Sequence, residues 1–89
     1  GRIAGIRRVE ARPITRILEG APIRGVETRV EVDEAAFLGP GDAHLFGTIL
    51  GRVLADRLGL NTFHELVLRL VPSERELRWP AMSGGRALI

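Results

Sequence analysis

The first third of the chain alternates between apolar and charged residues, which is the pattern of β-strands with one exposed face. Alternation in residues 6–18 is interrupted at Pro13, so this run predicts an edge strand with a break or bulge at the proline, which has no N–H to donate to a neighbouring strand. Residues 26–32 alternate without interruption and predict a second strand. The segment Glu19-Gly20-Ala21-Pro22 predicts a turn, so the two strands are expected to form a hairpin.

The two faces of this hairpin differ in polarity. One face of the second strand carries Val26, Thr28, Val30 and Val32. The other face is predicted to carry charges of both signs, with Arg8, Arg12 and Arg16 on the first strand opposite Glu27 and Glu31 on the second. Cross-strand pairs of this kind contribute about 0.2–1 kcal/mol each, so they fix the register of the strands more than they stabilise the sheet.

A helix is predicted after the break at residues 39–41. Asp42 is a candidate N-cap, because its carboxylate can accept hydrogen bonds from the free N–H groups of the first turn. The helix is expected to end near Leu58, with Gly59 in the left-handed position that follows many helices.

The predicted helix is apolar over a wider arc than one sheet can cover. Its large apolar residues are Leu45, Phe46, Ile49, Leu50, Val53, Leu54 and Leu58. They sweep about 220°, whereas packing on one sheet needs little more than about 100°. Small residues recur at every fourth position along one flank (Ala43, Gly47, Gly51 and Ala55) and permit close backbone approach. Either a neighbouring domain or subunit covers the second apolar side, or long loops of the same domain do.

We assign candidate protein-interaction residues to this arc. They are Phe46, Leu50, Leu54 and Arg57. Arginine is well suited to the rim of such a contact, because its guanidinium group binds carboxylates through two parallel hydrogen bonds.

The second half of the chain predicts two more strands. Leu66, Leu68 and Leu70 share one face of the run 63–71, although Thr62 and Glu65 also match the capping box of a helix. We favour a strand because the alternation continues to a turn at residues 72–74. Residues 76–79 predict a short last strand, and residues 80–89 an irregular tail with a flexible pair of glycines at 84 and 85. The order β-β-α-β-β predicts an α+β fold, with one main helix on a small, mostly antiparallel sheet.

Composition limits the class of protein. The chain has 89 residues, of which 45% are hydrophobic, 27% are charged and none is cysteine. These values predict a single domain over residues 1–89 and exclude disulfides and thiolate metal sites. No apolar run approaches the roughly 20 residues of a membrane-spanning helix. The chain begins with Gly1 and carries no signal-peptide pattern, so we expect a piece of a longer protein.

Candidate chemistry is sparse. His44 and His64 lie on different predicted elements, so a metal site with Asp42, Asp56 or Glu65 is not expected. Neither serine, at positions 73 and 83, lies in a nucleophile motif, and the glycines before the helix lack the lysine of a phosphate-binding loop. The sequence therefore predicts no catalytic, metal or cofactor site.

Arginine is the basic residue throughout, with a net charge of only +2. Arg7, Arg8, Arg12 and Arg16 could form a stripe that binds nucleic acid, which is the alternative function considered. Interleaved glutamates and the lack of an aromatic platform argue against it.

The second half of the chain also resembles a known family. Residues 43–55 (AHLFGTILGRVLA), 60–69 (LNTFHELVLR) and 77–88 (LRWPAMSGGRAL) are similar to the C-terminal helix and the two segments that follow it in TssF, the type VI secretion baseplate subunit also called ImpG or VasA. Residues 25–37 resemble the strand that precedes this helix. Thr62 and Val53 replace a serine and a phenylalanine of the family pattern, which is compatible with the same fold.

The resemblance implies a non-enzymatic protein without catalytic residues or cofactors. It implies the C-terminal domain of a larger structural subunit, in a bacterial cytoplasmic baseplate of the contractile injection machine that docks near the inner membrane. The implied partners are TssG, TssE, TssK and a second TssF copy, and the spike hub or sheath is a further possibility. Neither nucleic-acid binding nor membrane insertion is expected.

Overall fold

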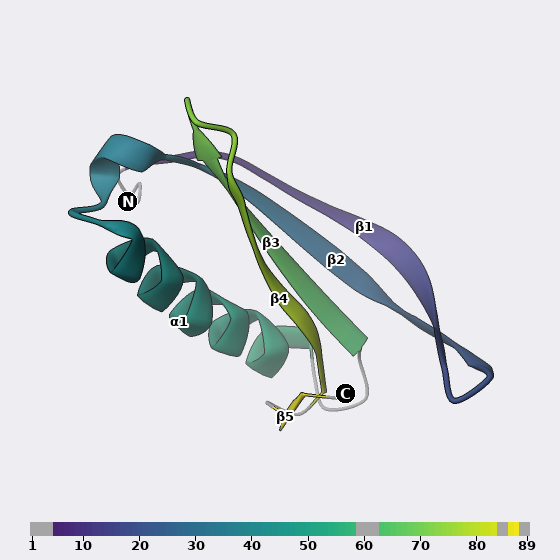
Figure 1. Ribbon diagram of the computed structural model, residues 1–89. Helices are drawn as coiled ribbons and strands as arrows, with labels where there is room; N and C mark the ends of the chain where they lie inside the picture. Colours follow the sequence, from purple (N-terminus) through teal and green to yellow (C-terminus); the bar gives the residue numbers. More distant parts are fainter. Residues whose placement is uncertain (1–4, 59–62, 84–85, 88–89) are drawn as a thin grey trace.

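The computed structural model describes residues 5–58, 63–83 and 86–87 (Figure 1). The elements are β1 (Ile6–Leu18), β2 (Ala21–Asp33), the 3₁₀ turn η1 (Glu34–Ala36), α1 (Pro40–Leu58), β3 (Phe63–Val71), β4 (Glu76–Ser83) and β5 (Arg86–Ala87). The order β-β-α-β-β and the α+β class are confirmed. The short β5 follows the predicted elements, and β4 continues to Ser83, so the tail is less irregular than expected.

All strands belong to one mixed sheet. Its five strands lie in the order β1-β2-β3-β4-β5. Three neighbouring pairs are antiparallel, but β2 and β3 are parallel, from Gly25 beside Phe63 to Asp33 beside Val71. The parallel pair arises because α1 carries the chain back along the sheet, so that β3 runs in the same direction as β2.

Pro13 does not interrupt β1, in contrast to the prediction. It pairs with Val26 in a continuous strand, and the irregularity lies instead between Ile6 and Arg8. Because β1 is at the edge of the sheet, a residue without an N–H is tolerated there. The predicted turn is confirmed at Glu19 and Gly20, whose φ angles of 50° and 79° suit a two-residue hairpin loop of type I′. Ala21 and Pro22, which were predicted as part of the turn, already belong to β2.

The helix begins three residues earlier than the predicted N-cap at Asp42 implies. Pro40 is its first residue, where its fixed φ and missing N–H cost nothing. The carbonyl of Gly39 accepts hydrogen bonds from the N–H groups of Asp42 and Ala43. Asp42 is therefore inside the first turn, and its carboxylate accepts a hydrogen bond from the N–H of Leu38 at 3.2 Å. The predicted role of Gly59 lies outside the described residues.

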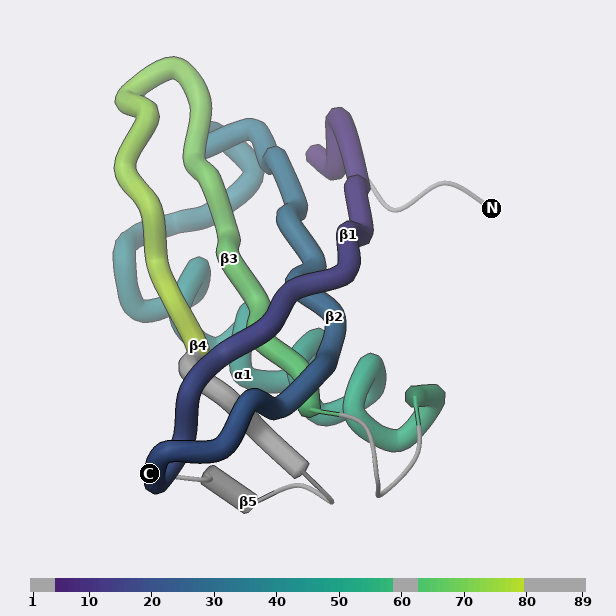
Figure 2. The backbone as a smooth tube through the Cα atoms, turned by 90° about the vertical axis from the view of Figure 1, so that its right-hand side faces the viewer, coloured from purple at the N-terminus to yellow at the C-terminus, as the bar shows by residue number. Residues whose placement is uncertain are grey.

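The segment 63–71 is a strand, as favoured, and its alternation separates the two faces of the sheet. α1 covers one face, mainly over β3 and β4 (Figures 1 and 2). The core between helix and sheet consists of Val30, Val32, Ala43, Leu66, Leu68 and Leu70. No described helix covers the opposite face, which is lined by charged side chains.

Candidate protein-interaction site

The small-residue flank of α1 faces the sheet, as the close-approach prediction requires. Ala43, Gly47 and Ala55 are buried. A Cβ atom at Gly47 would lie 2.0 Å from Cη2 of Trp79, so only glycine leaves room for the indole ring. A Cβ atom at Gly51 would lie 3.6 Å from Leu66, at ordinary contact distance. The helix is therefore seated on the sheet by its smallest residues.

Trp79 is held against the helix by polar contacts as well. Its indole Nε1 donates a hydrogen bond to Oγ1 of Thr48 at 3.2 Å, and Thr48 donates to the backbone carbonyl of His44 at 3.0 Å. The ring of His44 lies 5.4 Å from the indole, measured between centroids. The ring of Trp79 is thereby fixed along the edge of α1 that lies over β4.

The predicted interaction residues lie at different depths. Phe46, Leu50 and Leu54 are half-buried and pack against the core, and Phe46 also contacts Phe37 with ring centroids 5.6 Å apart. Arg57 is exposed and forms no ion pair with any residue that the structure describes. Their role in binding remains a prediction.

The most exposed large apolar residues of α1 belong to the predicted apolar arc but were not among the predicted interaction residues. Leu45, Ile49 and Val53 are 57%, 56% and 47% exposed. They recur at every fourth position and form a stripe, which we call the outer face of α1. A hollow beside this stripe is lined by Thr48, Ile49, Gly51, Arg52, Val53 and Trp79. No described element covers the outer face, so loops of the described part of the domain do not account for the wide apolar arc.

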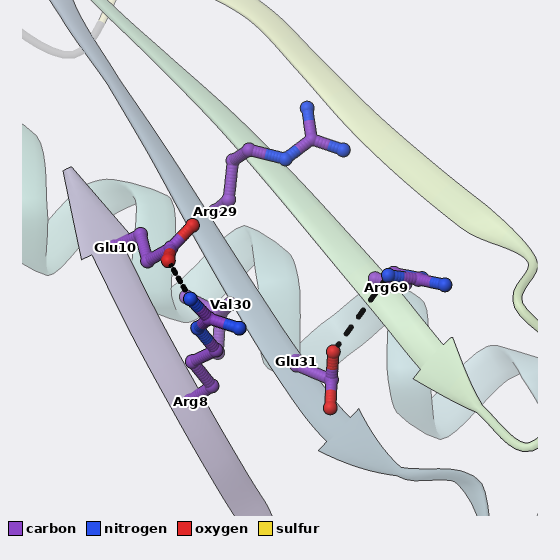
Figure 3. Close-up of a pocket in the computed structure, with 6 residues that line it drawn as sticks. All are labelled: Arg8, Glu10, Arg29, Val30, Glu31 and Arg69. Carbon is purple, nitrogen blue, oxygen red and sulfur yellow. Dashed lines mark ion pairs between the residues drawn. The ribbon is translucent and has the colours of Figure 1, made fainter. Parts of the chain in front are cut away.

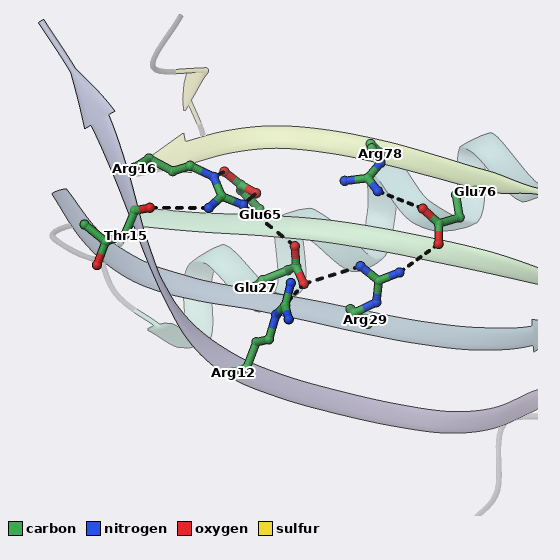
Figure 4. Close-up of polar contacts among 8 residues, drawn as sticks. All are labelled: Arg12, Thr15, Arg16, Glu27, Arg29, Glu65, Glu76 and Arg78. Atoms are coloured by element: carbon green, nitrogen blue, oxygen red, sulfur yellow. Dashed lines mark hydrogen bonds and ion pairs between the residues drawn. The ribbon is translucent and has the colours of Figure 1, made fainter. Parts of the chain in front are cut away.

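The sheet face opposite α1 carries a network of ion pairs (Figure 4). Glu27 is its buried centre, at 1% exposure, and lies within 4 Å of three arginines: Arg12 at 2.9 Å, Arg29 at 3.4 Å and Arg16 at 3.9 Å. Burial alone would raise the pKa of the Glu27 carboxyl, but the hydrogen bonds and charges of Arg12 and Arg29 outweigh it and hold this pKa below its usual value.

A second buried titratable group, His64, lies on β3 with its side chain toward the opposite face of the sheet from Glu27. His64 is 1% exposed, and its Nε2 is 3.3 Å from Oγ1 of Thr28. Burial lowers the pKa of His64, and the charge of Glu65 opposes this only in part. His64 is therefore a neutral core residue at pH 7, while His44 lies on α1 beside Trp79.

The four arginines of the predicted nucleic-acid stripe (Arg7, Arg8, Arg12 and Arg16) are paired with nearby carboxylates. Arg12 pairs with Glu27 as predicted, Arg16 binds Glu65 through two hydrogen bonds of 2.9 and 3.0 Å, and Arg8 pairs with Glu10. Around a hollow on the same face, Glu31 binds Arg69 at 3.8 Å and not the predicted Arg8 (Figure 3). A face whose cations are already paired has little charge left for phosphates, so the nucleic-acid alternative gains no support.

The described ranges offer no cluster of side chains suited to a metal ion. They contain no group of three or more histidine, cysteine or acidic side chains placed to hold a metal ion. Within the same ranges, no helix combines the length and the hydropathy that crossing a membrane requires.

The chain matches a known protein family over nearly its whole length. The sequence model of the family described as "Type VI secretion system, TssF" matches residues 1–86. The chain belongs to the TssF family. It is 40% identical, over 88 residues, to the type VI secretion system component TssF1 of Pseudomonas aeruginosa, and the match covers 94% of this chain and 14% of that protein.

Two solved structures contain a domain of the same fold. One is a cryo-electron microscopy structure of the type VI secretion system TssK-TssF-TssG baseplate subcomplex, with a TM-score of 0.77 and 35% identity over 93% of this chain and 16% of the matched chain. The other is the baseplate complex from the type VI secretion system, with a TM-score of 0.60 and 34% identity over 81% of this chain and 12% of the matched chain. The family match and the two structures confirm the resemblance to TssF that the sequence shows.

Proposed function

We propose that this TssF-family domain is a structural assembly module of a type VI secretion baseplate. The single observation that carries the proposal is the uncovered outer face of α1 in a chain whose solved relatives are components of baseplate complexes. Contiguous exposed apolar residues at helical spacing are typical of protein–protein contacts.

The outer face of α1 is the proposed contact. Leu45, Ile49 and Val53 would enter the interface directly, and Arg57 lies on the same helix, free to bind a partner carboxylate. Phe46, Leu50 and Leu54 support this face from below, because they pack against the core while remaining partly exposed. The predicted interaction set thus takes part in two ways, by contact and by support.

The proposed partners are other baseplate subunits. TssK and TssG are the first candidates, because the related TssF was solved in a subcomplex with both of them. TssE, a second TssF copy, and the spike hub or sheath remain proposals from the family resemblance. We further propose that the assembly is cytoplasmic and docks near the inner membrane.

We also propose that the domain acts by binding and not by catalysis. The reactive side chains of the described region have structural roles: His64 is buried beside Thr28, and Ser73 donates a hydrogen bond to Glu34 at 2.8 Å. A titratable group poised over a substrate pocket would be expected of an enzyme.

The test is assembly of the full-length protein with TssK and TssG. Ile49→Asp places a charge on the outer face and is expected to abolish co-purification of the three proteins. Val9→Asp is the matched control, because Val9 is 58% exposed but lies on β1. Normal assembly of the Ile49→Asp protein would overturn the proposed contact, and failure of the unsubstituted protein to assemble would overturn the proposed function.

A further inference from the structure

The hairpin of β1 and β2 extends beyond the rest of the sheet (Figure 1). The two strands pair as far as Leu18 beside Ala21, whereas β3 joins β2 only from Gly25 onward. Beyond the pair of Ile14 with Gly25 the hairpin is therefore a two-stranded ribbon, and we call residues 14–25 the arm. A two-stranded ribbon alone is at best marginally stable in water. An arm of this length is therefore expected to need further contacts, either within the chain or with a partner.

The two faces of the arm differ in exposure. Ile14, Arg16, Leu18 and Ile23 point to one face and are half-buried. The other face carries the cross-strand pairs of Thr15 with Arg24 and of Ile17 with Pro22, and all four residues are exposed. Ile17 is 68% exposed, which is more than any apolar residue of the outer face of α1.

The arm is held in one orientation before it meets a partner. Its tip is the tight turn of Glu19 and Gly20, both with positive φ, which matches the twist of the flanking strands. Its base is tied across β2 to β3, because the Arg16 guanidinium binds the Glu65 carboxylate through two hydrogen bonds of 2.9 and 3.0 Å (Figure 4). A pre-organised element loses less conformational entropy when it binds, so this construction favours docking.

We infer that the exposed face of the arm docks on an apolar protein surface that presents a carboxylate to Arg24. Ile17 and Pro22 supply the apolar contact. Arg24 supplies the charge, because it forms no ion pair with any part of the chain that the structure describes. Arginine binds carboxylates in a bidentate geometry, which gives such a contact a defined register.

A protein surface fits this face better than a nucleic acid or a membrane. Nucleic acid requires several cations that are free to contact phosphates, but the other arginine of the arm, Arg16, is occupied by Glu65. Anionic membranes likewise attract clusters of basic residues. One cation beside two apolar residues is instead the composition of a small protein contact.

The experiment places a photo-crosslinking amino acid at position 17, in place of Ile17, in the full-length protein inside the bacterium. The expected result is a crosslink to a protein segment that contains an aspartate or glutamate. Arg24→Glu is expected to lower the yield about tenfold, and changing that acidic residue to arginine in the partner is expected to restore it. Val9→Asp, outside the arm, is expected to leave the yield unchanged.

The outcomes separate this inference from the proposed function, on which it does not depend. No crosslink, a crosslink to nucleic acid or lipid, or a yield that Arg24→Glu leaves unchanged would overturn the docking role of the arm, even if TssK and TssG still assemble. A charge-dependent crosslink to a protein that is foreign to the baseplate would support the arm and contradict the baseplate role.

Discussion

The indole ring of Trp79 occupies the space that a side chain at Gly47 would need. An ideal Cβ atom at Gly47 would lie 2.0, 2.4 and 2.6 Å from three atoms of the ring, Cη2, Cζ2 and Cζ3. The ring cannot move aside freely, because its Nε1 is hydrogen-bonded to Thr48 and its face is next to His44. This pair therefore fixes how closely α1 approaches β4.

Gly47→Ala is expected to destabilise the domain by about 1–3 kcal/mol, since overpacking outweighs the gain of about 1 kcal/mol in helix propensity. The free energy of unfolding in urea measures this loss. Gly41→Ala is the control, because a Cβ atom at Gly41 meets no atom within 4 Å in the first turn of the same helix. Equal stability of the two variants would show that close approach at position 47 is not required.

Alanine substitutions on the two sides of α1 are expected to change the stability of the domain by different amounts. Leu50→Ala removes a half-buried side chain that packs on the core and should cost about 1–3 kcal/mol. Ile49→Ala removes an exposed side chain and should change the stability of the isolated domain by less than about 0.5 kcal/mol. Urea titrations of both variants test the assignment, which fails if Ile49→Ala is the more damaging substitution.

Glu27→Gln is expected to cost about 1.5–3 kcal/mol, because it weakens charge-assisted hydrogen bonds to a buried acceptor. Glu10→Gln is the matched control: Glu10 also pairs with an arginine but is 53% exposed at its side chain, and such surface pairs contribute about 0–1 kcal/mol. Thermal melts at low and high salt measure both effects. Similar losses for the two variants would contradict a special role for the buried carboxylate.

The stability of the domain is expected to fall on acidification between pH 7 and pH 5. The pKa of His64 is lower in the folded chain than in the unfolded chain, so the unfolded state takes up protons first as the pH falls below about 6.5. This contribution is complete above that pH and is lost as the pH falls through the folded pKa. Glu27, whose pKa is also lowered, adds a second loss at more acidic pH.

Urea denaturation at several pH values tests this expectation. The slope between pH 7 and pH 5 should be smaller in His64→Gln, which keeps a polar group near Thr28 but removes the titration. A parallel measurement of the His64 imidazole by nuclear magnetic resonance gives its pKa directly. An unchanged slope in the variant would assign the acid sensitivity to other groups.

Patterns that repeat locally made the elements predictable. The alternation of residues 26–32 and 63–71 identified both central strands, and the four-residue spacing of small residues identified the helix flank that packs on the sheet. The family resemblance rested on the same elements. Pro13 misled the prediction because an edge strand tolerates the missing N–H, a fact that depends on the position of β1 in the sheet.

Long-range pairing could not be predicted in the same way. The parallel arrangement of β2 and β3 follows from the path of the whole β2–α1–β3 unit, which periodicity does not encode. The split of the apolar arc into supporting and exposed residues, such as Leu50 and Ile49, depends on how far the helix is rotated on the sheet. Arg16 on β1 binds Glu65 on β3, although these strands are not neighbours in the sheet. The predicted hairpin of β1 and β2 could therefore indicate only the pairing of Arg16 with Glu27.

The parallel seam between β2 and β3 makes the domain indivisible. On either side of it lies a hairpin that a short turn can close early in folding, but the seam joins residues as distant along the chain as Gly25 and Phe63. Neither hairpin contains a complete hydrophobic core by itself. Val30 and Val32 belong to the β1–β2 hairpin, and Leu66 and Leu68 belong to the β3–β4 hairpin. Deletion of either hairpin is therefore expected to leave the remaining residues unfolded. The connecting helix α1 places β3 in register beside β2.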